Sequence, residues 1–185
     1  MTGGGPDRLR GRVQRFGENV NTDYIIGAKH KAASLDIAEM AKYTFEDIDP
    51  GFATRVRPGD LVVAGRNFGC GSSRETAVHV LAALGVAAVL APSFARIYFR
   101  NAINCGLPVL ECDTDGFEQD DDVSVDLAAG VAVDHTRGLE RPVTALPPVM
   151  RALLDAGGAA PYLALHGDLV LPHDPTVTDA PGDDR

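Results

Sequence analysis

The fold is decided by residues Leu61–Cys112, whose sequence is LVVAGRNFGCGSSRETAVHVLAALGVAAVLAPSFARIYFRNAINCGLPVLEC. Three short apolar runs, LVVAG, VAAVLA and LPVLEC, are typical of buried strands. The two longer runs between them, TAVHVLAAL and FARIYFRNAIN, predict helices that end at Gly85 and Gly106. Connections this short favour parallel strands with right-handed crossovers. The stretch therefore predicts a central β-α-β-α-β unit and an α/β fold.

The upstream segment predicts further elements. A strand is expected from Gly11, and a polar turn follows it at Glu18–Asp23. Asp36 and Glu39 have the spacing of a capping box, which predicts a helix from there through about Phe45.

The downstream segment predicts a hairpin and a closing helix. Alternation in VSVDLAAGVAVD indicates two strands that turn around Ala129 and Gly130. The run LPPVMRALLDAGG predicts a helix with Pro148 in its first turn and Gly157 at its end. We expect one domain over residues 11–165, as its length allows. A flexible N-terminus (1–10) and a disordered acidic tail rich in Pro and Asp (166–185) are expected to flank this domain.

The charge distribution separates two parts of the chain. The net charge of −9, from 26 acidic and 17 basic residues, argues against non-specific nucleic-acid binding. Seven acidic residues lie in Glu111–Asp122 and five in the segment 168–185. Residues 1–110 carry thirteen basic and ten acidic residues, a net charge of +3. This part of the chain is therefore expected to suit an anionic substrate.

The cysteines indicate a reduced, cytoplasmic protein. Cys70, Cys105 and Cys112 are too few for a disulfide framework, and their spacing is not that of a Cys-x-x-Cys metal site. The N-terminal residues lack an apolar secretory segment, and no run approaches the roughly 18 apolar residues of a membrane span. We expect a protein that is neither secreted nor membrane-inserted, with no metal ligands of its own.

The loop NFGCGSSRE, Asn67–Glu75, carries the most specific chemical signal. It joins a predicted strand to a predicted helix, and Ser72 stands three residues before Glu75, as in a capping box. A helix start and the fixed charge of Arg74 would together hold a carboxylate beside the Ser72 hydroxyl. The alternative is a tight turn in which Ser72 is only an N-cap. A phosphate loop fits less well, because both the Walker and the dinucleotide glycine patterns are missing.

Three motifs resemble the small subunits of aconitase-type hydro-lyases, in particular the 3-isopropylmalate dehydratase family, with homoaconitase as a near relative. They are Asn21–Asp23, Gly65–Glu75 and Ser93–Asn104, in the family's order and spacing. The resemblance implies a swivelling β/β/α domain that closes over a separate large subunit holding a [4Fe–4S] cluster. It also implies a reaction that removes water from a hydroxy-dicarboxylate and adds it back at the neighbouring carbon. Because three clustered thiolates are needed, the cluster is expected on the partner and not on this chain.

The same resemblance implies roles for individual residues. Ser72 matches the base that abstracts the proton, and Arg74 matches the arginine that binds a substrate carboxylate. Ser73 matches a neighbouring hydrogen-bond donor, and Asp23 matches an aspartate at the mouth of the site. For Asp23 and Asn21 the alternative is a turn held by side-chain to backbone bonds.

The segment after Asp23 departs from the family pattern. Relatives carry a proline where this chain has Gly27, and an aromatic-leucine pair where it has His30 and Lys31. Lys29, His30 and Lys31 are expected to bind substrate, meeting an extra carboxylate or phosphate, or else to form a solvated basic loop. The sequence therefore does not decide between isopropylmalate and another acid, such as homoaconitate, a citrate-like acid or an alkylated malate, as the substrate. A different class also stays open, a non-catalytic domain that binds an anion or a partner.

Overall fold

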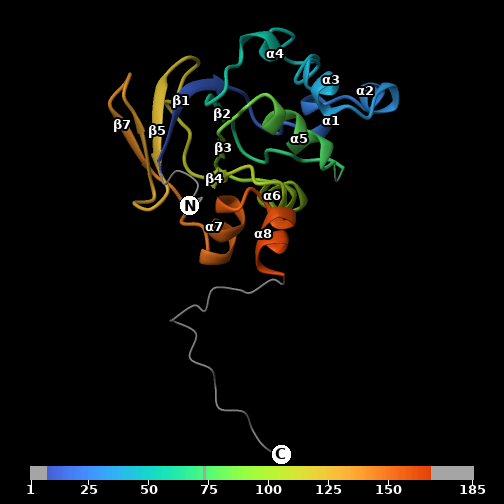
Figure 1. Cartoon of the computed structure of the whole chain (residues 1–185). Coiled ribbons are helices and arrows are strands. Elements are labelled where there is room, and N and C mark those ends of the chain that lie inside the picture. Colours follow the sequence, from blue (N-terminus) through green and yellow to red (C-terminus); the bar gives the residue numbers. More distant parts are fainter. Residues whose placement is uncertain (1–7, 73, 168–185) are drawn as a thin grey trace, which may run out of the picture.

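A mixed sheet of seven strands organises the chain in the computed structural model, which describes residues 8–72 and 74–167 (Figure 1). The strands are β1 Arg8–Arg15, β2 Leu61–Val63, β3 Ala88–Ala91, β4 Val109–Glu111, β5 Asp122–Asp126, β6 Val131–Asp134 and β7 Leu139–Pro142. Their order across the sheet is β4-β3-β2-β1-β5-β6-β7. Strands β1 to β4 run parallel, and β5 to β7 form an antiparallel meander attached to β1.

The predicted central unit is confirmed. Helix α5 (Thr76–Ala83) connects β2 to β3, and helix α6 (Arg96–Asn104) connects β3 to β4. All three strands pair in parallel, with Val62 opposite Val89 and Leu90 opposite Leu110. Sequence order equals spatial order here, as expected for short crossover connections.

Two apolar cores lie on opposite faces of the parallel strands. Val62, Val89 and Val109 face a core that also receives the buried side chains of the helices. Leu61, Val63 and Leu90 face a second core, shared with Val123 and other residues of the curled meander. Figure 1 shows α5 and α6 on one side of these strands and β5 and β7 on the other. The layering is therefore β/β/α, as predicted.

Four short helices connect β1 to β2, namely α1 Thr22–Ile25, α2 Ala28–Ala33, α3 Ile37–Ala41 and α4 Phe52–Arg55. Asp36 caps α3 as predicted, accepting a 2.8 Å hydrogen bond from the Ala38 N–H. The helix ends at Ala41 and not near Phe45, so its predicted length was wrong. Phe45 has a φ of 60° and donates its N–H to the Ile25 carbonyl, because its ring packs against Phe16 with centroids 4.1 Å apart.

The C-terminal part extends beyond the prediction. The hairpin and helix α7 (Pro148–Asp155) are confirmed, and β7 and α8 (Ala159–His166) are additional. Because α8 ends at His166, this residue belongs to a helix and not to a tail. Residues 8–10 likewise belong to β1 and not to a flexible N-terminus. The rest of both predicted flexible ends, residues 1–7 and 168–185, lies outside the described residues.

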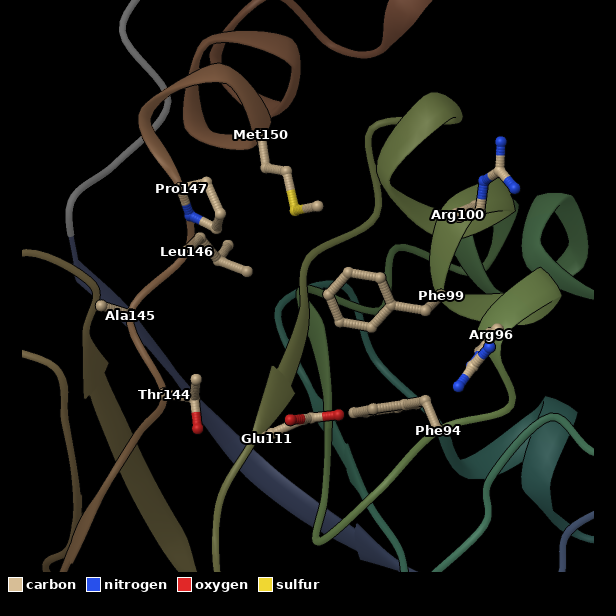
Figure 2. A pocket seen from close by; sticks show the side chains of 10 residues that line it. All are labelled: Phe94, Arg96, Phe99, Arg100, Glu111, Thr144, Ala145, Leu146, Pro147 and Met150. Carbon is tan, nitrogen blue, oxygen red and sulfur yellow. The ribbon is translucent and has the colours of Figure 1, made fainter. Parts of the chain in front are cut away.

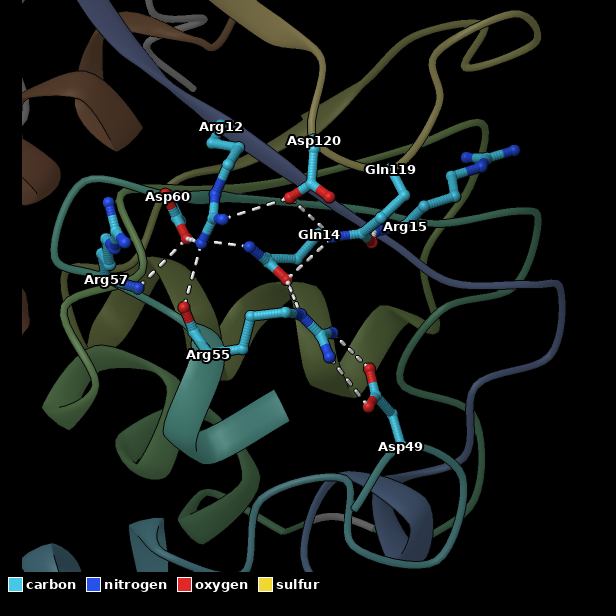
Figure 3. A network of polar contacts seen from close by, with 9 residues as sticks. All are labelled: Arg12, Gln14, Arg15, Asp49, Arg55, Arg57, Asp60, Gln119 and Asp120. Atoms are coloured by element: carbon cyan, nitrogen blue, oxygen red, sulfur yellow. Dashed lines mark hydrogen bonds and ion pairs between the residues drawn. The ribbon is translucent and has the colours of Figure 1, made fainter. Parts of the chain in front are cut away.

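A polar network joins β1 to α4 and to the acidic segment (Figure 3). Arg12 contacts Asp60 and Asp120, at 3.0 and 3.2 Å. Gln14, which is fully buried, donates to Asp60 at 2.8 Å and accepts from Arg55 at 3.0 Å. The network thus connects segments more than forty residues apart in the chain.

Two further arginines of β1 pair with aspartates along β5. Arg8 contacts Asp126 at 2.8 Å, and Arg10 contacts Asp122 at 2.5 Å. Two aspartates of β5 therefore pair with Arg8 and Arg10. The sequence had suggested that the net charge of +3 on residues 1–110 suits an anionic substrate. Three of the arginines in this part lie on β1 and pair instead with Asp126, Asp122 and Asp60.

Candidate active site

Three loops meet at the carboxyl ends of β1, β2 and β3, the edge where parallel α/β sheets commonly bind ligands. The loop after β2 lies between the other two and bonds to both through its backbone. Its contacts to the loop after β1 are Asn19 N to Arg66 O at 2.8 Å, Gly69 N to Val20 O at 2.8 Å and Thr22 N to Cys70 O at 2.9 Å. On its other side, the Phe68 N–H donates to Ser93 and the Ala95 N–H donates to Phe68, at 3.0 and 2.9 Å. The three sequence motifs are therefore brought together.

Two glycines allow this close approach. Gly69 has a φ of +75°, and a Cβ there would overlap the ring of Tyr98. Gly71 has a φ of +103°, and a Cβ there would overlap the side-chain amide of Asn21. Glycine is the residue that meets both the conformational and the spatial requirement at these positions.

Ser72 lies exposed at the tip of the central loop. Its carbonyl accepts a 3.0 Å hydrogen bond from the Thr22 hydroxyl, which ties the loop to the first motif. Helix α5 begins at Thr76, with Glu75 as an N-cap that makes no side-chain bond. The prediction that Ser72 caps this helix was therefore wrong. The reason is tertiary, because the left-handed Gly71 and the bond from Thr22 hold Ser72 in the loop, before the first turn of the helix.

Arg74 and Asp23 form an ion pair across the two loops. Within the described residues, Arg74 uses only its Nη1 group, which also lies 3.5 Å from the Ile26 carbonyl. The Nε and Nη2 groups are therefore open, in the fork geometry that binds a carboxylate. Asn21 accepts a 2.9 Å hydrogen bond from the Asp23 N–H, so Asp23 lies in a capped turn and also beside Arg74. Ser73 lies outside the described residues.

The predicted basic segment contacts a different part of the chain. Lys29 forms an ion pair with Glu46, and His30 Nε2 lies 2.7 Å from the same carboxylate. The His30 ring also stacks on Tyr43, with centroids 4.0 Å apart. Hydrogen bonds from His30 and Lys29 lower the pKa of Glu46, and the bond to Glu46 raises the pKa of Lys29. Among the described contacts, these two residues are joined to Glu46 and not to Ser72 or Arg74. The side chain of Lys31 is outside the described part.

A separate apolar hollow of about 340 Å³ lies between α6 and the start of α7 (Figure 2). Its apolar wall is formed by Phe94, Phe99, Leu146, Pro147 and Met150. Arg96 and Arg100, one helical turn apart, stand along its edge in Figure 2. Sequence reasoning missed this hollow, because its two walls come from segments about fifty residues apart that give no joint signal. None of the predicted site residues lines it.

The three cysteines do not form an iron–sulfur site on this chain. Cys70 lies 3.5 Å from the Asn19 carbonyl, and Cys112 is buried in the core under the meander. Burial, followed by the neighbouring Asp113, raises the pKa of the Cys112 thiol to about 12. Within the described residues, the one group of three metal-ligating side chains contains a single cysteine. Since a cluster needs three thiolates in one place, this chain does not fit it.

Comparison with known proteins agrees with this arrangement. The aconitase C-terminal domain family matches residues 17–115, more than half of the chain and the region of all three motifs. This match defines the class of the fold and of the loop cluster.

Individual relatives identify the family within this class. The 3-isopropylmalate dehydratase small subunit 2 of Archaeoglobus fulgidus is 46% identical over 162 residues, 88% of this chain and 98% of that protein. The 3-isopropylmalate dehydratase small subunit of Moorella thermoacetica is 48% identical over 158 residues, 84% and 95% of the two chains. The crystal structure of 3-isopropylmalate dehydratase (LeuD) from Methanocaldococcus jannaschii superposes with a TM-score of 0.83 at 39% identity, covering 86% of this chain and 95% of that one.

The chain therefore belongs to the 3-isopropylmalate dehydratase small-subunit family of hydro-lyase components. Among the described residues, no helix is long and apolar enough to span a membrane.

Proposed function

We propose that the chain supplies the base and a carboxylate-binding arginine for interconverting 2-isopropylmalate and 3-isopropylmalate, after docking onto a large subunit that holds a [4Fe–4S] cluster. The observation that carries this proposal is the Arg74–Asp23 ion pair, which leaves two guanidinium nitrogens without a partner among the described residues, in the same loop as the exposed Ser72. We place the protein in the cytoplasm, since its three cysteines are free.

Ser72 acts as the general base. As an alkoxide it takes the proton from the carbon next to the one that loses hydroxide, leaving an unsaturated acid. Hydroxide then adds to the neighbouring carbon while Ser72 returns its proton to the other, which restores the alkoxide. A serine hydroxyl is a poor base, so it needs fixed positive charge nearby. Arg74 supplies that charge two residues along the same loop.

Arg74 orients the substrate. Its Nε and Nη2 groups hold one carboxylate through two parallel hydrogen bonds, while Asp23 fixes the guanidinium from the other side. Ser73 adds a further hydrogen bond to the substrate. When bound in the large subunit, the cluster supplies a Lewis acid for the leaving hydroxyl.

The contacts of the basic segment favour an apolar substrate group. Glu46 engages both Lys29 and His30, so these residues are not left free for an extra carboxylate. Tyr24, directly after Asp23, is 46% exposed and offers an apolar surface. We propose that Lys29 and His30 hold the segment in place and that the isopropyl acid is preferred.

Reconstitution with the iron–sulfur large subunit tests the proposed base. Turnover is followed by the absorbance of the unsaturated acid, with Ser72→Ala compared with Ser124→Ala, a serine on β5 remote from the loops. Loss of a general base lowers kcat by about 10²- to 10⁴-fold. We expect that loss in the first variant and unchanged turnover in the second. Full turnover by Ser72→Ala would show that another group is the base.

A substrate panel tests the preference. Isopropylmalate, homoaconitate, a citrate-like acid and an alkylated malate are compared on the wild type and on Lys29→Ala, His30→Ala and Lys31→Ala. We expect the highest kcat/KM with isopropylmalate. A higher value for an acid with an extra carboxylate, lost in the lysine variants, would instead assign these residues to substrate binding.

A further inference from the structure

Three potential metal ligands converge where α5 begins and just past the end of α6. Glu75 and His79 are four residues apart and share one face of α5, and Cys105 caps the C-terminus of α6. The Cys105 sulfur lies 3.5 Å from Glu75 Oε1 and 3.7 Å from His79 Nε2. Glu75 Oε1 and His79 Nε2 are 3.7 Å apart.

These separations match those of a tetrahedral zinc site. Zinc bonds of about 2.3 Å to sulfur and about 2.0–2.1 Å to nitrogen or oxygen place ligand atoms about 3.3–3.6 Å apart at tetrahedral angles. All three observed separations lie within a few tenths of an ångström of that range. A divalent ion could therefore contact all three atoms with only small side-chain adjustments.

A buried polar group lies near this cluster. The Tyr98 hydroxyl is buried without a hydrogen-bond partner in the described part of the chain, and Cys105 contributes to raising its pKa. An unsatisfied oxygen near this cluster is costly in an apolar core, and a site that holds an ion offers it a polar environment.

We propose that Glu75, His79 and Cys105 bind a divalent cation of the zinc type, with a fourth position open to water or to a partner. Mixed sulfur, nitrogen and oxygen ligands in tetrahedral arrangement favour Zn²⁺ over Mg²⁺ or Ca²⁺. Since Glu75 directly follows Arg74, the ion braces the end of the Ser72 loop against α6. The site is independent of the proposed reaction. Its ligands His79 and Cys105 are 26 residues apart in the chain, a spacing that gives no sequence signal.

Cobalt titration of the purified full chain tests the site without any assay of turnover. Co²⁺ replaces Zn²⁺ in such sites, and its bond to a thiolate gives a near-ultraviolet charge-transfer band. We expect the band to saturate at one equivalent and to disappear on addition of Zn²⁺. In Cys105→Ala the band should be lost, whereas in the matched control Cys70→Ala it should be unchanged.

A second pair of variants distinguishes ligation from misfolding. Even outer-shell partners change metal affinity by about 10- to 100-fold, so His79→Ala and Glu75→Gln should each weaken Zn²⁺ binding at least tenfold, with unchanged far-ultraviolet circular dichroism. Zn²⁺ should also raise the melting temperature of the wild type but not of Cys105→Ala. A missing or non-stoichiometric band, or one that survives Cys105→Ala, would overturn the proposal.

Discussion

Two arginines, Arg55 and Arg74, each pair with an aspartate across a loop, yet their surroundings differ. Arg55 uses all three guanidinium nitrogens, with Nε bound to Gln14 at 3.0 Å and its two terminal nitrogens bound to Asp49 at 3.2 and 2.5 Å (Figure 3). Arg74 uses only Nη1 among the described contacts. A saturated arginine fixes the fold, whereas an arginine with open donors is available to a ligand.

The aspartates near these two arginines differ in their number of contacts. Asp60 receives three hydrogen bonds, from Arg12, Gln14 and the Arg57 N–H, so several partners determine its position. Asp23 is half-exposed and holds Arg74 from one side. Several contacts to one side chain stabilise the fold. Side chains with few contacts, as at the candidate site, can bind a ligand.

The largest effect is expected from Gly69→Ala. An alanine here keeps the left-handed backbone conformation, which costs about 1–2 kcal/mol. Its Cβ also overlaps the Tyr98 ring, which costs about 1–3 kcal/mol more. We expect the free energy of unfolding in urea to fall by about 2–5 kcal/mol. Gly138→Ala is the matched control, because its φ is also positive but its Cβ meets open space. Equal losses in the two variants would mean that the loop is not packed against Tyr98.

Arg74→Gln should reduce activity without destabilising the fold. Hydrogen bonds to a charged group contribute about 1.5–3 kcal/mol, which corresponds to about a 10- to 150-fold loss of kcat/KM. The change in unfolding free energy should stay below about 1 kcal/mol, since Asp23 is half-exposed and holds Arg74 through one guanidinium nitrogen only. Steady-state kinetics of the reconstituted enzyme and urea unfolding measure the two effects. A loss of stability with normal kinetics would show that Arg74 has a structural role and does not bind the substrate.

Arg55→Gln should give the opposite result. Removing a partly exposed arginine that holds Asp49 and Gln14 is expected to cost about 1–2 kcal/mol of stability. The turnover of the folded, reconstituted enzyme should be unchanged, because Arg55 belongs to the network under β1. Reduced kcat at full stability would show that the network contributes to the site.

The smallest effect is expected from acid acting on the contacts between β1 and β5. The hydrogen bond from Arg10 lowers the pKa of Asp122, and the Ala129 N–H, then Arg8, lower that of Asp126. A carboxylate whose pKa is lower in the folded state stabilises the fold above its unfolded pKa of about 3.9, and this contribution is lost as pH falls through the folded value. Melting temperature should therefore be level above about pH 5 and decline below about pH 4. In Arg10→Gln the decline should be shallower, and an equal decline would exclude this pair as a cause.

Local signals explain which predictions were confirmed. The central β-α-β-α-β unit follows from run lengths and from glycines that end helices, both properties of neighbouring residues. The start of α3 at Asp36 was right because a cap is a local contact. Its end was wrong because the conformation of Phe45 depends on Phe16, 29 residues earlier in the chain. The Ser72 cap failed for a similar reason, since Thr22 holds the Ser72 carbonyl from another loop.

The sequence by itself determined the order of the elements and the loop that carries Ser72 and Arg74. The reason is that hydrophobic periodicity and motif spacing depend only on residues near one another in the chain. Only the tertiary structure decided which charged side chains are free. Aspartates pair with Arg8, Arg10 and Arg12 of β1. Glu46 engages Lys29 and His30, whereas Arg74 keeps two donors without a partner among the described residues. Charge pairing depends on which residues, distant in the chain, become neighbours in the fold. Glu75, His79 and Cys105 also become neighbours only in the fold.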